Sequence, residues 1–245
     1  MLENGLITRV QSFKAKLIEA KTRAGVSDFP WYPYGSLDNI GHVNKVMPGG
    51  WTALEKRLVG TRVADIGAAD GELAFFLEDA GIDVDIIDNG PTNFNGLKGA
   101  LELRQALGSD VRIFEIDLDQ KVDLPDKYEF VFFLGLLYHL KNPFYILELL
   151  ARHSKGMFIS TRVCTHDRIG GTLIRDIPAA YLVNSYEANN DATNFWMFTH
   201  AGLRRILDRT GWTIRAMKMF GATERSDPFS RENDERAFAY LESQH

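Results

Sequence analysis

The nine residues from Val63 to Gly71, VADIGAADG, constrain the fold of this chain more than any other segment. A short apolar run ends in an acid, passes into a turn of glycine and alanine, and continues as apolar residues at helical spacing (ELAFFL, 72–77). This order predicts a strand, a glycine loop and a helix. Gly67 and Gly71 have no Cβ atom, so a ligand can lie against their backbone, and the free amides of the helix start point to the same place. The segment therefore predicts a nucleotide-binding turn.

The spacing of the glycines separates this turn from two other nucleotide loops. Position 69 is alanine and the third glycine of a dinucleotide G-x-G-x-x-G is missing, and the Lys-Ser or Lys-Thr of a P-loop does not follow. The segment DIGAADG (65–71) instead resembles the first motif of class I S-adenosylmethionine-dependent methyltransferases. The resemblance implies that S-adenosyl-L-methionine is the cofactor, that S-adenosyl-L-homocysteine is the product, and that the loop packs against the amino-acid end of the cofactor through Asp65, Gly67, Ala68, Ala69 and Gly71.

Length and composition set the outer limits. A chain of 245 residues with 45% hydrophobic residues is long enough for one α/β domain with a modest appendage. We expect an N-terminal helical and aromatic extension over residues 1–50 and a cofactor-binding domain over 51–245. The net charge of −5 excludes a basic field over the whole protein, although a local basic patch stays open.

The cysteine content and the apolar runs indicate the compartment. Cys164 is the only cysteine, which excludes an internal disulfide and a thiolate metal cluster and is typical of a reducing cytosol. The longest apolar run, 130–137, is too short to cross a membrane, and the N-terminal MLENG lacks the charged start and apolar middle of a signal peptide. We therefore expect a cytoplasmic protein with no membrane partner; the sequence leaves the oligomeric state open.

The N-terminal extension is predicted to contain a helix and an aromatic loop. Apolar residues at 6, 10, 13, 17 and 20 form one stripe of a helix over 6–24, ended by Gly25, which either packs on the domain or contacts a partner or RNA. Residues 28–35, DFPWYPYG, are too rich in proline for a helix or a central strand. This loop either plugs the core or covers a pocket. Residues 51–58 are predicted to form a short helix.

Two further strand ends follow the glycine loop. A strand over 82–87 ends at Asp88, 23 positions after Asp65, where the αβ unit returns beside the first strand and a carboxylate can accept both ribose hydroxyls. Asp88, with Asn89 beside it, is therefore the predicted ribose contact. After a helix over 97–107 and a strand over 111–116, the resemblance implies that Asp117 binds the adenine amino group and that Leu118 supplies a backbone amide. Asp119 is the alternative to Asp117.

The segment from Tyr128 to Pro143, YEFVFFLGLLYHLKNP, is the second motif. Its strand is apolar on both faces, as expected inside a parallel sheet. Gly135 makes the turn, and the strand end and the turn place Leu134, Tyr138 and His139 at the carboxyl edge, where open α/β sheets bind ligands. No aspartate follows this strand, as it does in the Asn-Pro-Pro-Tyr or Asp-Pro-Pro-Tyr enzymes that methylate amines, which argues against methylation of an exocyclic base amine. The alternative is that Tyr138 and His139 have no role in binding or catalysis and form a half-buried pair of rings that caps the sheet.

The run GLLYH (135–139) with Lys-Asn-Pro resembles the tRNA wobble-uridine carboxymethyltransferases that make uridine 5-oxyacetic acid. The likeness continues through 194–199, 203–207 and 211–212, and covers about 50–220. In that group a Lys, the Tyr of Leu-Tyr-His and an Arg hold the extra carboxylate of carboxy-S-adenosylmethionine. Only Tyr138 carries over: no Lys stands beside Trp31, and the counterpart of the Arg is one of Arg225, Arg231 and Arg236. Because a buried anion without its cation is costly, we expect plain S-adenosyl-L-methionine and disfavour carboxy-S-adenosylmethionine.

The rest of the chain completes the predicted fold, an α/β Rossmann-like sheet of strand order 3-2-1-4-5-7-6. A helix over 144–152 and a strand over 156–161 precede an insertion over 163–198, rich in Asn, Tyr and Trp, which is either a substrate lid or a surface excursion. A helix over 200–209 follows. An antiparallel pair, 213–220 with 236–242, closes the sheet, and 226–235 is predicted to be a polar connection between its strands.

These motifs predict methyl transfer to a small or medium polar acceptor. In-line transfer depends mainly on positioning, and a base is needed only for an un-ionised hydroxyl or an ammonium. His139 is the predicted base, with Tyr138 beside it; the weaker candidates are His42, His166 and His200. Gly135 and Thr161 do not supply the ligands of a metal-assisted enzyme, so no metal is predicted. The alternatives are a tRNA wobble-uridine modifier, with tRNA as partner, and a noncatalytic cofactor-binding protein.

Overall fold

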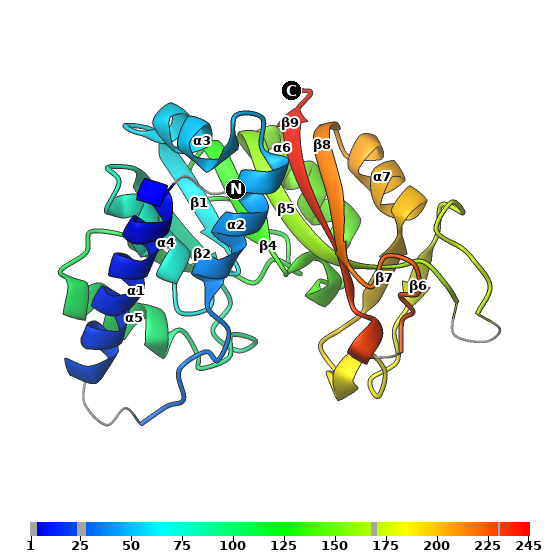
Figure 1. Ribbon diagram of the computed structural model, residues 1–245, viewed down its shortest axis with the longest axis horizontal. Helices are drawn as coiled ribbons and strands as arrows, with labels where there is room; N and C mark the ends of the chain where they lie inside the picture. The colour runs from blue at the N-terminus through cyan, green and yellow to red at the C-terminus, as the bar shows by residue number, and fades with distance from the viewer. Residues whose placement is uncertain (1–3, 24–27, 168–170, 230) are drawn as a thin grey trace. The chain divides into compact units, whose positions relative to one another are not determined.

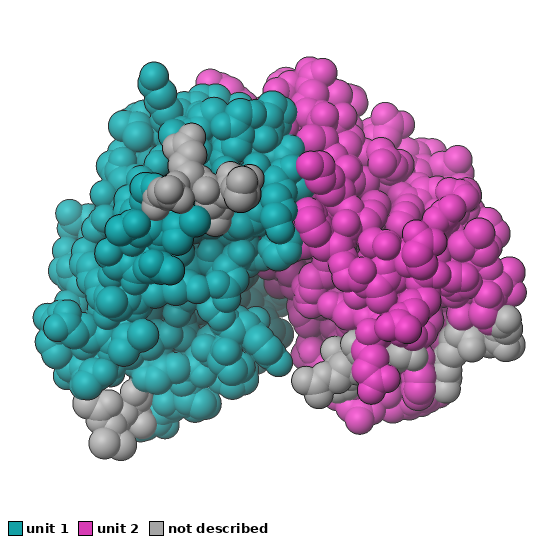
Figure 2. All heavy atoms as spheres, viewed as in Figure 1, with its two compact units in different colours: residues 1–132 teal, residues 133–245 magenta. Residues whose placement is uncertain are grey.

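The computed structural model describes residues 4–23, 28–167, 171–229 and 231–245 (Figure 1). The chain divides into two compact units, Met1–Phe132 and Phe133–His245, which Figure 2 shows in different colours. The boundary falls inside strand β4 (Tyr128–Leu134). Among the residues described, no helix has the length and apolar character needed to cross a membrane.

The first unit contains a parallel set of strands with helices between them. In chain order its elements are α1 (Asn4–Arg23), η1 (Ser36–Asp38), α2 (Asn39–Val46), α3 (Gly50–Leu58), β1 (Arg62–Ile66), α4 (Glu72–Glu78), β2 (Asp83–Asp88), α5 (Lys98–Leu107) and β3 (Arg112–Glu115). Strand β2 pairs in parallel with β1 and with β3. The predicted helices and strands of this region are confirmed. Helix α2, whose buried residues are Ile40, Val43 and Val46, was not predicted.

Helix α1 packs on its own unit through the predicted stripe. Leu6, Phe13, Leu17 and Ala20 are buried, the helix packs against α5, and the Phe13 ring meets the Phe76 ring edge-on at 5.3 Å. This stripe faces the core because it is the one side of the helix with an unbroken row of apolar side chains. The packing interpretation of this helix is therefore confirmed. The predicted end at Gly25 lies outside the described residues.

The second unit contains an antiparallel set of strands and two helices. Its elements are η2 (Leu137–His139), α6 (Pro143–His153), β5 (Ser154–Cys164), β6 (Ala180–Leu182), η3 (Ala188–Asn190), β7 (Trp196–Thr199), α7 (His200–Arg209), β8 (Trp212–Gly221), η4 (Arg231–Asn233) and β9 (Glu235–Ser243). Helix α6 starts where Asn142 Oδ1 accepts a hydrogen bond from the Tyr145 amide and proline occupies the first turn. Strand β9 pairs antiparallel with both β5 and β8 (Figure 1).

The hydrogen-bonded strand order is β3-β2-β1-β4-β5, and β9 and then β8 complete the predicted order. The insertion adds two strands that were not predicted: β7 pairs in parallel with the end of β5 at Cys164, and β6 pairs antiparallel with β7. Strand β5 runs to Cys164, so the predicted start of the insertion at 163 is too early. The predicted polar connection over 226–235 lies between β8 and β9 as expected, except that Glu235 is already the first residue of β9. Its two end residues, Ser226 and Glu235, are buried and hydrogen-bonded to each other.

Candidate functional site

The glycine loop joins the end of β1 to α4 by a tight turn. Gly67 and Gly71 have φ angles of 73° and 77°, and Ala69 also has a positive φ, 54°. The Gly67 amide donates to the Ile87 carbonyl oxygen at 2.9 Å, which ties the loop to β2. A Cβ on Gly71 would lie 2.6 Å from Ile86 Cδ1 and 3.0 Å from the Phe75 ring. The sequence therefore needs glycine at position 71 for both conformation and space.

Replacing Gly71 by alanine is expected to destabilise the protein more than replacing Gly81, which has a φ of 81° but where an added Cβ would meet no other atom within 4 Å. Gly81→Ala is expected to cost only the strain of the left-handed backbone conformation, about 1–2 kcal/mol. Gly71→Ala adds the close contacts, for about 1–3 kcal/mol more. Urea unfolding of the two variants and the parent measures the difference, and equal losses would show that the close approach carries no cost.

Two carboxylates, Asp65 and Asp88, lie at the carboxyl ends of β1 and β2. Asp65 is 3% exposed, and its Oδ2 atom has no hydrogen-bond partner among the residues described. Burial and the neighbouring charge of Asp88 raise the pKa of Asp65 to about 7, against a smaller lowering by the Ala74 amide. Burial also raises the pKa of Asp88, although three hydrogen bonds oppose it. Because both pKa values are raised by the cost of a buried negative charge, a cation bound beside the pair would stabilise the two carboxylates.

The three hydrogen bonds to Asp88 join it to the glycine loop. Its Oδ2 atom accepts from the Ala69 amide at 3.2 Å and from Asn93 Nδ2 at 2.9 Å, and its Oδ1 atom accepts from the Asn89 amide at 2.8 Å. The structure thus brings together three predicted cofactor residues, Ala69, Asp88 and Asn89. A half-buried carboxylate held in this way still has lone pairs for a ligand hydroxyl.

Asn93 is a residue that the sequence analysis missed. Its Nδ2 atom also donates to the Ala69 carbonyl oxygen at 3.3 Å, and its Oδ1 atom accepts from the Asn95 and Leu97 amides at 3.1 and 3.0 Å. Asn93 therefore connects the glycine loop and Asp88 to the start of α5. In the sequence, Asn93 is marked only by its position five residues after Asp88. It belongs to no periodic pattern, so sequence analysis could not single it out.

The aromatic loop is tied to the glycine loop through Asp70. Buried Asp70 accepts from the Tyr32 amide at 2.9 Å and from Asn95 Nδ2 at 2.7 Å, and Asn95 Nδ2 also donates to the Pro30 carbonyl oxygen at 3.2 Å. Trp31 and Tyr32 are half-buried, and Tyr34 is 67% exposed. The loop is not a core plug, because none of its rings is fully buried. Its place beside the glycine loop is consistent with the alternative, a cover for that region.

The predicted adenine contacts follow β3. Asp117 is half-buried and its Oδ1 atom accepts from the Asp119 amide at 3.0 Å, while Leu118 is buried. The Ile116 amide donates to the Asp88 carbonyl oxygen at 2.9 Å, so this segment is held beside the end of β2. The Asp117 side chain is thus held by the backbone of Asp119.

In the second unit, Tyr138 and His139 form one turn after Gly135. Gly135 has a φ of 72° and its amide donates to the Ser160 carbonyl oxygen at 2.9 Å. The Tyr138 and His139 ring centroids are 4.2 Å apart, and Tyr138 is 7% exposed. The insertion holds this turn, because the Phe195 amide donates to the Tyr138 carbonyl oxygen at 2.8 Å. Leu134, at the end of β4, is half-buried.

Arg236, on β9, contacts the predicted Tyr138. Its Nη1 atom lies 3.3 Å from the Tyr138 hydroxyl oxygen, and its guanidinium carbon lies 5.6 Å from the centroid of the Tyr138 ring. Asp234 pairs with Arg236 at 3.2 Å and with Arg162 at 2.6 Å. Two guanidinium groups share one carboxylate here, so this cluster of Arg162, Asp234 and Arg236 carries one excess positive charge. Arg236, one of the three arginines left open by the sequence, is thus in contact with Tyr138.

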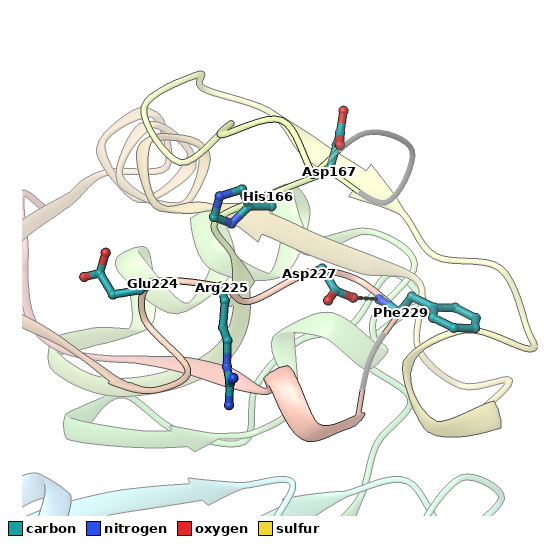
Figure 3. A pocket seen from close by; sticks show the side chains of 7 residues that line it. His166, Asp167, Glu224, Arg225, Asp227 and Phe229 are labelled. Atoms are coloured by element: carbon teal, nitrogen blue, oxygen red, sulfur yellow. Dashed lines mark hydrogen bonds between the residues drawn. The ribbon is translucent and has the colours of Figure 1, made fainter.

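A separate pocket of about 430 Å³ lies between the segment after β5 and the connection from β8 to β9 (Figure 3). It is lined by His166, Asp167, Gly171, Glu224, Arg225, Asp227 and Phe229. Two residues singled out from the sequence are among them, the weaker base candidate His166 and Arg225, one of the three arginines left open. Over the described ranges, no group of three or more His, Cys, Asp or Glu side chains is arranged to hold a metal ion.

The fold and the glycine loop together define a class I S-adenosylmethionine-dependent methyltransferase. Residues 42–217 match the model of a family described as a methyltransferase domain, and the chain belongs to this family. No curated protein sequence matches the chain.

Solved structures share the fold at low sequence identity. The N-terminal domain of EvdMO1 with SAH bound is 15% identical, with 95% of this chain and 97% of that chain covered and a TM-score of 0.56. Magnesium protoporphyrin IX methyltransferase from Synechocystis PCC 6803 with bound SAM is 18% identical over 99% of both chains, with a TM-score of 0.54. A methyltransferase from Mesorhizobium loti is 16% identical over 78% of this chain and 96% of that chain, with a TM-score of 0.56. The SAM and SAH in these neighbours are consistent with S-adenosylmethionine as the cofactor.

Proposed function

We propose that this protein transfers a methyl group from S-adenosyl-L-methionine to a small or medium polar acceptor. The observation that carries the proposal is the acidic glycine loop, in which Asp88 is fixed by the Ala69 amide and a buried oxygen of Asp65 has no partner among the residues described. A ligand with a cationic centre and vicinal hydroxyls fits these acceptor oxygens and their negative charges. The cofactor supplies an activated methyl group on a positively charged sulfur.

The protein's own residues would supply binding, positioning and a base. Asp88 would accept the ribose hydroxyls, Gly67 and Gly71 would leave room for the amino-acid end, and Asp117 would face the adenine. His139 would take a proton from the acceptor, because neutral imidazole is a base near neutral pH. We further propose that the protein works in the cytoplasm.

Calorimetry tests the cofactor part of the proposal. S-Adenosylmethionine and S-adenosylhomocysteine are expected to bind, and Asp88→Asn is expected to weaken both at least about tenfold, because an uncharged amide replaces the acceptor of two hydroxyls. Asp83→Asn is the matched control: Asp83 is exposed at the opposite end of the same strand and should leave both affinities unchanged. No heat with either ligand from a folded sample would overturn the proposal and support a different role for the loop.

Transfer of tritiated methyl groups tests the catalytic part. The protein is incubated with labelled S-adenosylmethionine and a cellular metabolite extract, and separately with total tRNA. Labelled small molecules support the proposal. Cofactor binding without any labelled product in either sample would favour the noncatalytic alternative.

A second candidate function is carboxymethyl transfer to a tRNA wobble uridine. The contact between Arg236 and the Tyr138 hydroxyl favours it, because a cation beside this tyrosine is what an extra carboxylate on the cofactor would need. Mass spectrometry of the ligand that copurifies with the protein distinguishes the two sulfonium cofactors by mass. A tRNA enzyme would also bind tRNA with an affinity that falls steeply as salt rises.

A further inference from the structure

Two residues of the insertion, Thr193 and Asp191, hold the His139 ring in place. His139 Nδ1 lies 3.1 Å from the Thr193 carbonyl oxygen and 2.9 Å from Thr193 Oγ1. Thr193 Oγ1 in turn lies 2.6 Å from Asp191 Oδ1, and the Thr193 amide donates to the same Asp191 oxygen at 2.9 Å. Asp191 therefore sets the position of Thr193, and both oxygen atoms of Thr193 face one nitrogen of the imidazole.

These contacts determine which ring nitrogen carries the proton. A carbonyl oxygen can only accept, so its contact with Nδ1 is a hydrogen bond only when Nδ1 is protonated. The Asp191 carboxylate also only accepts, so the Thr193 hydroxyl donates its hydrogen to Asp191 and leaves its oxygen to accept from Nδ1–H. Both contacts require the same tautomer, in which Nε2 has a free lone pair.

We propose that Asp191 and Thr193 are positioning residues that hold His139 in the Nδ1–H tautomer with Nε2 as the base, and that the acceptor reacts through an un-ionised hydroxyl or an amine that carries a proton. The second clause rests on the proposed function. A general base is useful only where the reacting atom must lose a proton. A carboxylate acceptor is already deprotonated and needs no base.

The proposed step moves one proton and one methyl group. His139 Nε2 takes the proton from the acceptor O–H or N–H, the acceptor's electron pair forms the bond to the methyl carbon, and the electrons of the carbon–sulfur bond stay on sulfur. The products are the methylated acceptor, S-adenosylhomocysteine and a protonated His139, which then releases its proton to water.

Burial favours the neutral form of His139. Burial lowers the pKa of His139 from its ordinary 6.5, and the positive charges of Arg236 and Arg162 lower it further, against the bond to Thr193 and the charge of Asp191. The Tyr138 ring packs on the imidazole. The acidic limb of the rate profile is therefore expected below pH 6.5, and Asp191→Asn should move it to lower pH, because a group that raises the pKa is lost.

Nitrogen NMR of the His139 ring tests the tautomer without any need for activity. The spectrum of ¹⁵N-histidine-labelled protein is recorded at pH 7.5, and the His139 signals are assigned by their loss in His139→Gln. The expected result is a protonated Nδ1 and a lone-pair Nε2. A protonated Nε2 in the parent protein would overturn the proposal.

Variants of the relay separate positioning from a structural role. In Asp191→Ala the Thr193 hydroxyl loses its acceptor and becomes free to donate to Nδ1, so the spectrum should shift toward the Nε2–H tautomer. The double variant Asp191→Ala/Thr193→Val removes that competing donor, and the Thr193 carbonyl should restore the Nδ1–H tautomer. Asp191→Asn keeps an acceptor oxygen and should resemble the parent. A spectrum unchanged in Asp191→Ala would overturn the relay.

The acceptor class is tested on the labelled products of the extract assay. Mild alkali hydrolyses methyl esters and releases tritiated methanol, whereas methyl ethers and methylamines keep their label. Alkali-stable label supports an acceptor with a hydroxyl or amine, and alkali-labile label would overturn that clause. If no label enters any product while the ring spectra behave as expected, the proposed function fails and the relay stands.

Discussion

Replacing His139 by glutamine is expected to lower kcat for methyl transfer by about 10²–10⁴-fold, the usual contribution of a general base. Glutamine keeps a polar side chain that can still donate to the Thr193 carbonyl oxygen, but it cannot take a proton. The affinity for S-adenosylhomocysteine should change little, because His139 is predicted to act on the acceptor. Steady-state kinetics with the labelled acceptor, together with calorimetry, separate the two effects.

His166→Gln is the matched control for this experiment. His166 lines the separate pocket of Figure 3, is not among the residues of the proposed base, and was one of the weaker candidates from the sequence. Its replacement should leave kcat unchanged. A rate for His139→Gln equal to that of the parent protein would remove His139 from the mechanism.

Replacing Asp65 by asparagine is expected to remove a pH dependence of stability. The pKa of Asp65 rises from 3.8 to about 7 on folding, so the folded state binds a proton that the unfolded state lacks between these values. Stability from this group is therefore greatest in acid and falls as pH rises through 7. From pH 6 to pH 8 the loss is about 1.4 kcal/mol. Urea unfolding at both pH values, without cofactor, measures it.

The control for the stability experiment is Asp83→Asn, an exposed carboxylate in the same unit. This variant should show the same change between pH 6 and pH 8 as the parent, whereas Asp65→Asn should show a smaller one and should be the more stable protein at pH 8. If Asp65→Asn keeps the full change, the buried carboxyl group is not the source of the pH dependence.

Much of the fold follows from local patterns. The short apolar runs predicted β1, β2 and β4 near their observed positions, because a buried parallel strand needs an uninterrupted apolar segment. The stripe on α1 was equally clear, since five apolar residues repeat at helical spacing. Strands β6 and β7 were missed because each has only three or four residues, and helix α2 was missed as well.

Alternation of polar and apolar residues along a strand cannot predict which charged side chains are buried. Asp85 lies inside β2 and is fully buried, yet it accepts from two nitrogens of Arg112, from Arg62 and from the Tyr128 hydroxyl. These partners lie on three other strands, and nothing in the sequence marks them as neighbours. The same holds for the contact of Arg236 with Tyr138, which are 98 residues apart.

By itself, the sequence determined the fold class, the glycine loop and the acids at the strand ends, because these depend on residues adjacent in the chain. Only the tertiary structure decided which distant side chains act together: Asn93 with Asp88, Arg236 with Tyr138, and Asp191 and Thr193 with His139. The physical reason is that hydrogen bonds and charge effects operate over a few ångströms. The number of residues between two side chains in the sequence does not determine their distance in the folded protein.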